Sequence, residues 1–165
     1  MRRIAQLANE IDAVVIAEGG PALRTIAQGL GAETRLQLLG TGVWNDPAIA
    51  AEPALQGGWF PGPAPGTRQV FEERFQATYG RPPAAIASLA YDAVSLAAAL
   101  ARGAPPGGRF TADRIADPNG FAGVDGLFRF NPDGTIERGL AVLQVTPQGF
   151  QVIDPPPRSF VASNF

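Results

Sequence analysis

The sequence predicts an α/β fold with three layers, in which a mostly parallel sheet is flanked by helices and followed by a C-terminal β-hairpin. The segment 12–17 is a short continuous apolar run, as is typical of parallel strands that are covered on both faces, and 36–39 is predicted to be the next strand. The segment between them has the apolar spacing of a helix, so the three elements form a right-handed βαβ unit. Glycines follow both strands, at 19 and 20 and at 40 and 42, where the loops of α/β sheets form ligand clefts.

The first helix is expected to begin at Pro21, which suits a first turn, and to end before Gly31. Its apolar residues share one helical face: Leu23, Ile26, Ala27 and Leu30. A third strand is predicted at 57–60, which makes 1–60 one βαβ portion. The prolines and glycines of 61–68 then predict a hinge, because they exclude a helix and permit a bend.

Residues 69–118 are predicted to be helical. The first of these helices is expected over 68–79 with Thr67 as its cap. A second helix, over 84–102, has apolar residues on nearly every side, which predicts burial within a larger body. A short third helix is expected at 111–116. The residues of the first helix that are predicted to face inward are Val70, Phe71 and Phe75.

Two residues of the long helix need partners. A buried carboxylate is costly unless it is paired, so Asp92 is expected to form a salt bridge or a hydrogen bond to a neighbouring loop. A functional role for Asp92 is the alternative. Tyr91 is expected in the core with its hydroxyl group hydrogen-bonded.

The remainder of the chain predicts β-structure. Residues 131–134 have the sequence of a type I turn, with proline second and glycine fourth. Residues 119–153 are therefore expected to form a β-hairpin region, and 154–165 a tail. The expected strands are 121–124, 126–130, 140–145 and 149–153.

The composition disfavours several classes of function. The net charge is −2, and the 13 basic residues, all arginine, are scattered, so nucleic acid is not an expected partner. The absence of histidine and cysteine excludes Ser-His-Asp and Cys-His catalysis and the usual zinc ligand sets. We therefore expect no catalytic residue, no metal and no cofactor, and an enzyme is the least favoured class.

The first candidate binding segment is Glu18, Gly19 and Gly20, between the first strand and the first helix. The start of a helix offers free N–H groups and favours an anion. A ligand carboxylate is expected to bind there, and Glu18 is expected to pair with a ligand ammonium group. The alternative is that Glu18 only belongs to the helix start.

The second candidate segment is Thr41, Gly42 and Trp44, after the second strand. Trp44 is expected to offer an aromatic wall beside exposed backbone N–H groups, and an ordinary strand-end turn is the alternative. The segment 40–45 is also similar to a dinucleotide-binding loop. Asn45 stands where that loop requires its third glycine, so a nucleotide site is disfavoured.

The order of these features resembles the type I periplasmic binding proteins, in the branch of the leucine-isoleucine-valine receptors. The segments that carry the resemblance are 12–20, 38–44, 55–58, Phe75 with 79–82, 90–94, 121–130 and 133–134. Within that family the chain is most similar to proteobacterial penicillin-binding protein activators. The segments behind this second likeness are 39–44, 57–60, 119–126 and 138–143.

The resemblance implies the C-terminal half of a two-lobed fold with a ligand cleft between the lobes. Residues 1–60 and 119–153 would belong to the second lobe, and 69–118 would pack on the first. The sequence is then expected to be a fragment with its signal peptide upstream. The apolar faces that this leaves uncovered, including Phe71 and Phe75, predict self-association of the fragment.

The implied function is a non-catalytic, periplasmic ligand-binding domain of an ABC-importer receptor of the branched-chain amino acid type. Its partners would be a small polar solute, such as an amino acid, and an ABC permease. Positions around Glu18, Gly19 and Gly42 match ligand contacts of the family. Amino-acid receptors often carry an acidic residue at the position of Gly42 for the ligand's ammonium group, and this chain has glycine. The alternative is a regulatory lipoprotein domain that activates a peptidoglycan synthase.

Overall fold

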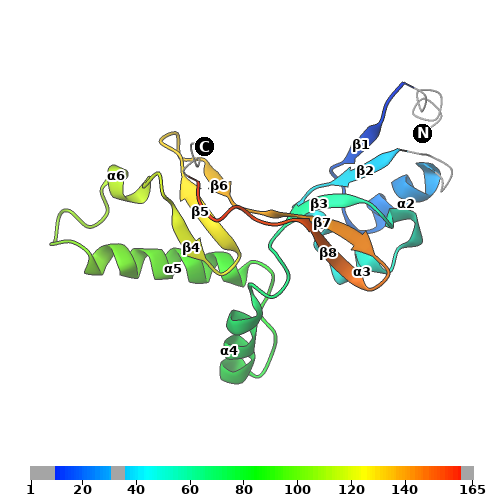
Figure 1. The fold of residues 1–165 in the computed structure, drawn as a ribbon. Coiled ribbons are helices and arrows are strands. Elements are labelled where there is room, and N and C mark those ends of the chain that lie inside the picture. The colour runs from blue at the N-terminus through cyan, green and yellow to red at the C-terminus, as the bar shows by residue number, and fades with distance from the viewer. Residues whose placement is uncertain (1–9, 31–35, 161–165) are drawn as a thin grey trace. The chain divides into compact units, whose positions relative to one another are not determined.

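The computed structural model describes residues 10–30 and 36–160, and these divide into two compact units. Unit 1 contains the described residues up to Gly62 together with Ala141–Pro155. Unit 2 contains Pro63–Leu140 and the residues from Pro156 onward. Figure 1 labels the elements of both units. The predicted roles of 61–68 as a hinge, and of 69–118 and 119–153 as parts of different lobes, stay predictions.

Unit 1 is built on a five-stranded mixed sheet with the strand order β1-β2-β3-β7-β8. The pairs β1–β2 and β2–β3 are parallel, whereas β3–β7 and β7–β8 are antiparallel. The predicted α/β class is confirmed, and the parallel part of the sheet is confined to its first three strands. The elements of unit 1 are β1 (Ala13–Ile16), α2 (Gly20–Leu30), β2 (Gln37–Gly40), η1 (Gly42–Trp44), α3 (Pro47–Ala50), η2 (Pro53–Leu55), β3 (Trp59–Gly62), β7 (Ala141–Thr146) and β8 (Gly149–Asp154).

The predicted βαβ unit is present in unit 1. The apolar stripe of α2 faces the core, where Leu23, Ala27 and Leu30 are buried. Gly31, the expected end of this helix, lies outside the described residues, as do residues 1–9 of the predicted βαβ portion. Strand β7 alternates buried and half-buried residues, which is the period of a strand with one face on the core. The core of unit 1 consists of Ile16, Leu23, Ala27, Leu30, Leu36, Trp44, Ile49, Leu55, Phe60, Ala141, Leu143 and Val145.

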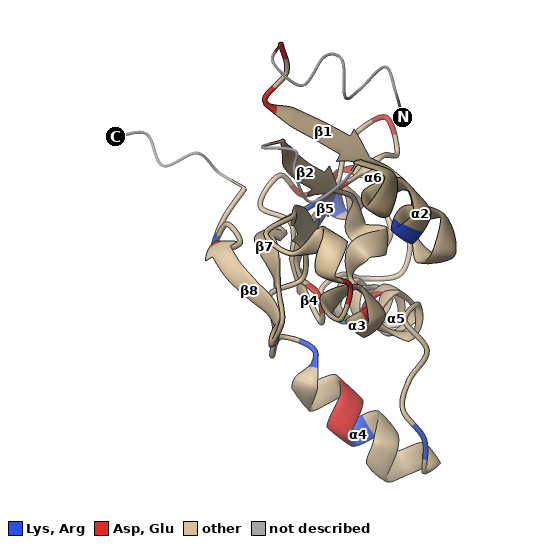
Figure 2. Cartoon of the chain, turned by 90° about the vertical axis from the view of Figure 1, so that its right-hand side faces the viewer, with Lys and Arg blue, Asp and Glu red and all other residues tan. Residues whose placement is uncertain are grey.

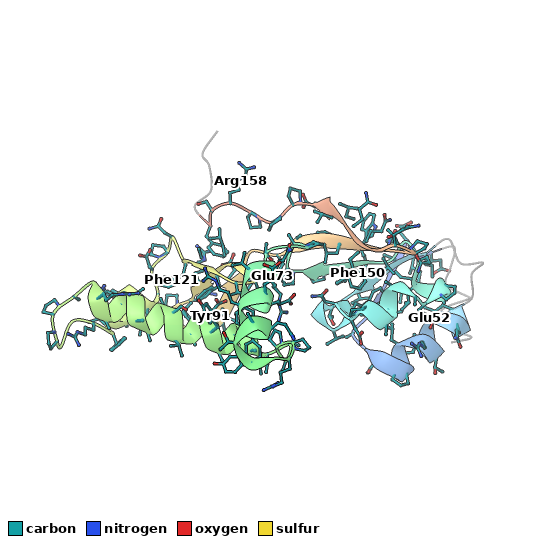
Figure 3. The ribbon with its side chains drawn as sticks, turned by 90° about the horizontal axis from the view of Figure 1, so that it is seen from below. Glu52, Glu73, Tyr91, Phe121, Phe150 and Arg158 are labelled. Atoms are coloured by element: carbon teal, nitrogen blue, oxygen red, sulfur yellow. The ribbon has the colours of Figure 1, made fainter. Side chains whose placement is uncertain are left out.

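Strand β3 extends further than its prolines and glycines suggested. It continues through Pro61 and Gly62, which pair with Val142 and Ala141 of β7. Proline lacks an N–H group, but β2 pairs with β3 only at Trp59, so no donor toward β2 is needed at Pro61. Phe150 of β8 (Figure 3) packs edge-on against the Phe60 ring of β3 at a centroid distance of 4.9 Å.

Unit 2 combines three helices with the three-stranded antiparallel sheet β4-β5-β6. The hairpin turn is closed by Asn131 and Thr135, since the Asn131 amide donates to the Thr135 carbonyl at 2.8 Å. Strand β6 is short and its side chains are mostly exposed, so it was not predicted from the sequence. The elements of unit 2 are α4 (Gln69–Tyr79), α5 (Ala87–Arg102), α6 (Ala112–Ile115), β4 (Phe121–Gly123), β5 (Gly126–Phe130) and β6 (Ile136–Arg138).

Polar contacts fasten α5 to the β4–β5 turn. Asp92 accepts a hydrogen bond of 2.8 Å from the Val124 amide, which confirms the expected bond to a neighbouring loop. The Ser88 hydroxyl donates to Asp125 at 2.7 Å, and both side chains are buried. The Arg68 guanidinium lies 3.3 Å from the other oxygen of Asp125, which ties the start of α4 to the same turn.

Several expectations for unit 2 were wrong. Thr67 does not cap α4, because its hydroxyl donates to the Ala64 carbonyl and closes the preceding turn. Val70 is exposed rather than inward, and Tyr91 is half exposed rather than in the core. Among the described residues of α5, only Ser88, Asp92 and Leu100 are buried, so unit 2 covers only part of this helix.

None of the helices within the described ranges is long and apolar enough to cross a membrane.

Candidate functional site

The two predicted binding segments leave the sheet side by side. Strands β1 and β2 are parallel neighbours, and their last residues, Ile16 and Gly40, are register partners. Residues 17–20 and 41–44 therefore start from the same edge of the sheet. The carboxyl edge of parallel strands is where α/β sheets bind ligands. The structure thus brings Glu18, Gly19, Gly20, Thr41, Gly42 and Trp44 into one region.

The Trp44 side chain connects the two segments through a hydrogen bond. Its indole N–H donates a hydrogen bond of 3.2 Å to the Glu18 carbonyl oxygen. The ring is 0% exposed and packs against the backbone of Gly40 and Gly58, where any Cβ atom would collide with it. Phe60 lies against the same ring at a centroid distance of 6.3 Å. The expected aromatic wall is therefore wrong, and Trp44 instead holds the two loops together from within the core.

The burial of Trp44 was not predicted, because this burial depends on two glycines that lie far apart in the sequence. Gly40 ends β2 and Gly58 precedes β3, and together they leave the space that the indole occupies. The sequence did contain a signal for this burial. Gly40 and Gly58 stand next to two successive strands, and Trp44 follows the first of them. A buried tryptophan usually needs a hydrogen-bond acceptor for its indole N–H group. For Trp44 this acceptor is the Glu18 carbonyl oxygen.

The loop after β1 is shaped by its two glycines. Gly20 has a φ of +55°, a left-handed conformation that other residues rarely adopt. A Cβ atom on Gly19 would lie 3.4 Å from the Val43 side chain, so the two loops are in contact. The Gly19 carbonyl accepts from the Leu23 amide at 3.4 Å, which begins α2. Before Leu23, the start of α2 has amide N–H groups at Gly20 and Ala22 but none at Pro21, and these two amides have no carbonyl one turn earlier in the helix.

The remaining candidates form the outer surface of this edge. The Glu18 side chain and Gly42 are exposed, and Thr41 is half-buried. The Thr41 carbonyl accepts from the Trp44 amide at 2.9 Å and so closes the turn of η1. A Cβ atom on Gly42 would approach nothing closer than the Pro61 carbonyl oxygen at 3.8 Å. The edge thus combines one exposed carboxylate, a helix start and an open glycine position, and we define it as the β1–β2 edge.

Within residues 10–30 and 36–160, no three acidic, histidine or cysteine side chains cluster as metal ligands would.

No protein-family model matches this sequence, and no curated protein matches it. Solved structures do match. A Rhodospirillum rubrum protein described as a branched-chain amino acid ABC transporter matches 93% of this chain at 25% identity, with a TM-score of 0.69. A Desulfitobacterium hafniense ABC transporter substrate-binding protein in complex with Leu matches 92% at 24% identity, with a TM-score of 0.62. The solute-binding protein of an R. palustris ABC transporter, in complex with benzoate, matches 94% of this chain at 21% identity, with a TM-score of 0.60.

The matches cover this chain almost completely but cover those proteins only in part. The chain corresponds to 49%, 47% and 47% of the three matched chains, respectively, so it spans about half of their length. The predicted resemblance is confirmed at the level of fold, whereas the further likeness to penicillin-binding protein activators has no support. Over its length, the chain has the type I periplasmic-binding fold of the substrate-binding proteins of branched-chain amino acid ABC transporters.

Proposed function

We propose that this chain is part of a non-catalytic solute-binding domain that serves as the periplasmic receptor of an ABC importer. The observation that carries the proposal is the fold match over 93% of the chain to a protein described as a branched-chain amino acid ABC transporter. None of the three matched proteins is described as acting in cell-wall synthesis, and nothing favours the regulatory alternative. An ABC permease is the proposed protein partner.

The proposed ligand is a small solute that carries a carboxylate. Leucine and benzoate, which occupy two of the matched proteins, share this group and differ in the ammonium group that only leucine has. The start of α2 favours an anion because its first amides lack intrahelical acceptors and the helix dipole is positive there. A carboxylate near Gly19 and Gly20 would accept from these amides.

Glu18 is the proposed partner for an ammonium group on the ligand. Its side chain is exposed at the β1–β2 edge, while its carbonyl is held by Trp44. This fixes the backbone at Glu18 but leaves the carboxylate free to turn toward a ligand. An exposed charge pair of this kind contributes about 0.2–1 kcal/mol, so Glu18 would adjust selectivity more than overall affinity.

Calorimetric titration of the 165-residue chain with leucine and with benzoate tests the proposal. Glu18→Gln removes the charge and keeps the size of the side chain. Glu10→Gln is the matched control, because Glu10 is also exposed but precedes β1, at the end of the strand opposite to the β1–β2 edge.

Saturable binding of either solute supports the receptor function. If leucine binds, Glu18→Gln is expected to weaken leucine two- to fivefold and to leave benzoate unchanged, since benzoate has no ammonium group. Glu10→Gln should change neither. No heat of binding with either solute, in a chain whose circular dichroism shows it to be folded, would contradict the proposal for this chain. Equal losses with Glu18→Gln and Glu10→Gln would remove Glu18 from the site.

A further inference from the structure

Two turns of unit 2 have closely related sequences: Asp-Pro-Asn-Gly at 117–120, before β4, and Asn-Pro-Asp-Gly at 131–134, between β5 and β6. In each turn the glycine amide donates to the carbonyl of the first residue at 2.9 Å. Asn119 is exposed, and it is the only asparagine of the sequence that precedes a glycine. Glycine has no side chain to hinder an approach to its nitrogen, so this pair is prone to deamidation.

Deamidation of Asn119 is a reaction within the chain. The Gly120 nitrogen attacks the side-chain carbonyl carbon of Asn119, a C–N bond forms, and the side-chain nitrogen leaves as ammonia together with the amide proton of Gly120. Water then opens the resulting five-membered imide at one of its two carbonyl groups. Opening on one side gives aspartate. Opening on the other gives isoaspartate, in which the main chain runs through Cγ.

Asp117 holds both reacting groups in the folded chain. The Gly120 amide, which must lose its proton, donates to the Asp117 carbonyl at 2.9 Å. The side-chain amide of Asn119, which contains the leaving nitrogen, donates to Asp117 Oδ1 at 3.0 Å. The backbone amide of Asn119 donates to the same oxygen at 2.9 Å. The attack requires the first two of these bonds to break, so the turn raises the barrier to the reaction.

We propose that Asn119 is a latent deamidation site and that Asp117 keeps its conversion slow in the folded chain. The conversion matters for the fold because Gly120 has a φ of +71°, and a Cβ atom there would lie 2.6 Å from the Phe128 carbonyl oxygen. Isoaspartate adds one carbon to the main chain immediately before this tightly packed glycine. The pairing of Phe121 with Phe128, which begins β4, is then disturbed.

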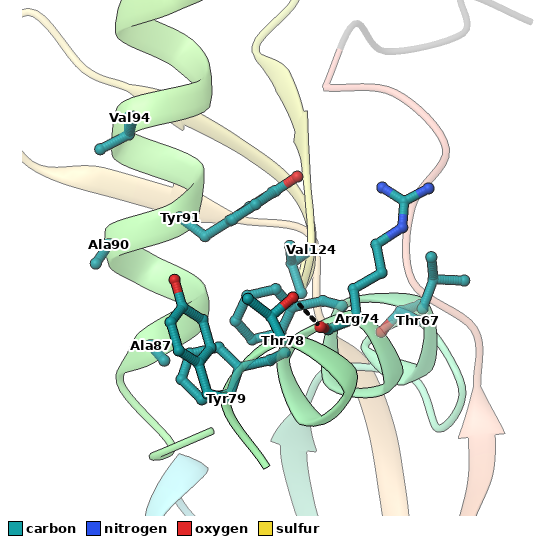
Figure 4. Close-up of a pocket in the computed structure, with 12 residues that line it drawn as sticks. Thr67, Arg74, Thr78, Tyr79, Ala87, Ala90, Tyr91, Val94 and Val124 are labelled. Carbon is teal, nitrogen blue, oxygen red and sulfur yellow. Dashed lines mark hydrogen bonds between the residues drawn. The ribbon is translucent and has the colours of Figure 1, made fainter. Parts of the chain in front are cut away.

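Strand β4 leads to the turn that holds α5. The Val124 amide donates to Asp92, and the Val124 side chain lies with Tyr91 in the lining of the groove between α4 and α5 (Figure 4). A disturbed β4 therefore weakens the attachment of α5. The isoaspartate form of the chain is expected to unfold at a lower urea concentration than the parent form.

Incubation of the full chain at neutral pH, followed by peptide mass mapping, measures the conversion of Asn119. The chain unfolded in guanidinium chloride gives the rate of the unprotected pair. Asp117→Ala is the test variant, because it removes Oδ1 and leaves the turn carbonyl. Asp117→Asn keeps an acceptor oxygen, and it adds no reactive pair because Pro118 has no N–H group. Asp133→Ala is the matched control in the second turn, where the carboxylate also accepts from a backbone amide.

The folded wild-type chain is expected to convert about tenfold more slowly than the unfolded chain, or more slowly still, since two hydrogen bonds must break. Asp117→Ala should convert about two- to tenfold faster than the wild type, as expected for the loss of one of them. Asp117→Asn and Asp133→Ala should stay near the wild-type rate. Isoaspartate is distinguished from aspartate by electron-transfer fragmentation.

A second readout is charge. The charged residues of the described chain are spread over both units (Figure 2), and the net charge is only −2, so one added negative charge should delay elution from an anion-exchange column. Equal rates in the folded and unfolded wild-type chain would overturn the inference without any variant. So would an unchanged rate in Asp117→Ala, or an equal acceleration in Asp133→Ala, with native circular dichroism. The solute titration is independent of these outcomes, because the β1–β2 edge lies in unit 1.

Discussion

Trp44 should be the most costly single side chain to remove from unit 1. Its ring is fully buried and contacts the backbones of Gly40, at the end of β2, and of Gly58, which accepts a hydrogen bond from the Val145 amide of β7. These two backbones are held by the sheet and cannot collapse into the vacated space. Large-to-small substitutions at such sites cost about 3–5 kcal/mol for tryptophan, and the upper half of that range applies where the site cannot relax. Trp44→Ala is therefore expected to cost about 4–5 kcal/mol, much of the stability of a small domain.

Trp44→Phe separates packing from the hydrogen bond. Phenylalanine keeps most of the ring contacts with Phe60 but cannot donate to the Glu18 carbonyl. Loss of that bond costs about 0.5–1.5 kcal/mol, and the smaller ring adds about 1 kcal/mol for the unfilled volume. The expected total is about 2 kcal/mol, which is half of the cost of the alanine variant.

Urea unfolding followed by tryptophan fluorescence measures both variants. The chain has two tryptophans, so Trp59 reports on unit 1 when Trp44 is replaced. Trp59→Phe is the control: Trp59 lies in β3 but is 38% exposed, and its replacement should cost less than about 1 kcal/mol. With a slope of about 2 kcal/mol per molar urea, the midpoint of Trp44→Ala should fall by about 2 M. Equal costs for Trp44→Ala and Trp59→Phe would refute the assignment of Trp44 to the core.

Three further predictions concern single contacts. Gly20→Ala should cost about 1–2 kcal/mol, measured by thermal unfolding, because alanine is strained at the φ of +55° found there. Ser88→Ala should destabilise unit 2 by about 1–3 kcal/mol, because it leaves one oxygen of buried Asp125 without its donor; urea unfolding with no change in midpoint would argue against this. In unit 2, hydrogen bonds from the hydroxyl and the amide of Thr135 hold the pKa of Asp133 below its ordinary value, so Thr135→Val should raise that pKa in an NMR titration. The stabilisation that this lowered pKa provides is present above the ordinary pKa and is lost as the pH falls through the folded-state pKa.

The local elements of unit 1 could be predicted from the sequence because their signals are local. The apolar run before Glu18 lies within one strand, and the helical spacing from Leu23 to Leu30 lies within one helix. Each pattern therefore predicts its element without knowledge of the tertiary contacts. From two parallel strands it follows that both carboxyl ends share one edge. The proximity of Glu18 and Trp44 could be deduced in this way, and the hydrogen bond between them confirms it.

The orientation of Trp44 and the exposure of α5 could not be predicted in the same way. The first depends on a cavity between Gly40 and Gly58, which are brought together only by the pairing of β2 with β3. The second depends on what packs against a helix that is apolar on nearly all sides, and periodicity does not identify that partner. Asp92 was the exception within α5, since a buried carboxylate has few alternatives to a nearby backbone donor.

The most direct test of the β1–β2 edge as a ligand surface is an NMR titration of the ¹⁵N-labelled chain with leucine and benzoate. The account predicts saturable shifts of the amides of Gly19, Gly20 and Gly42 and of the indole N–H of Trp44, which is bonded to the Glu18 carbonyl. The amide of Gly134, in the β5–β6 turn of unit 2, should not move. Shifts confined to unit 2, or none at the β1–β2 edge at saturating solute, would contradict it.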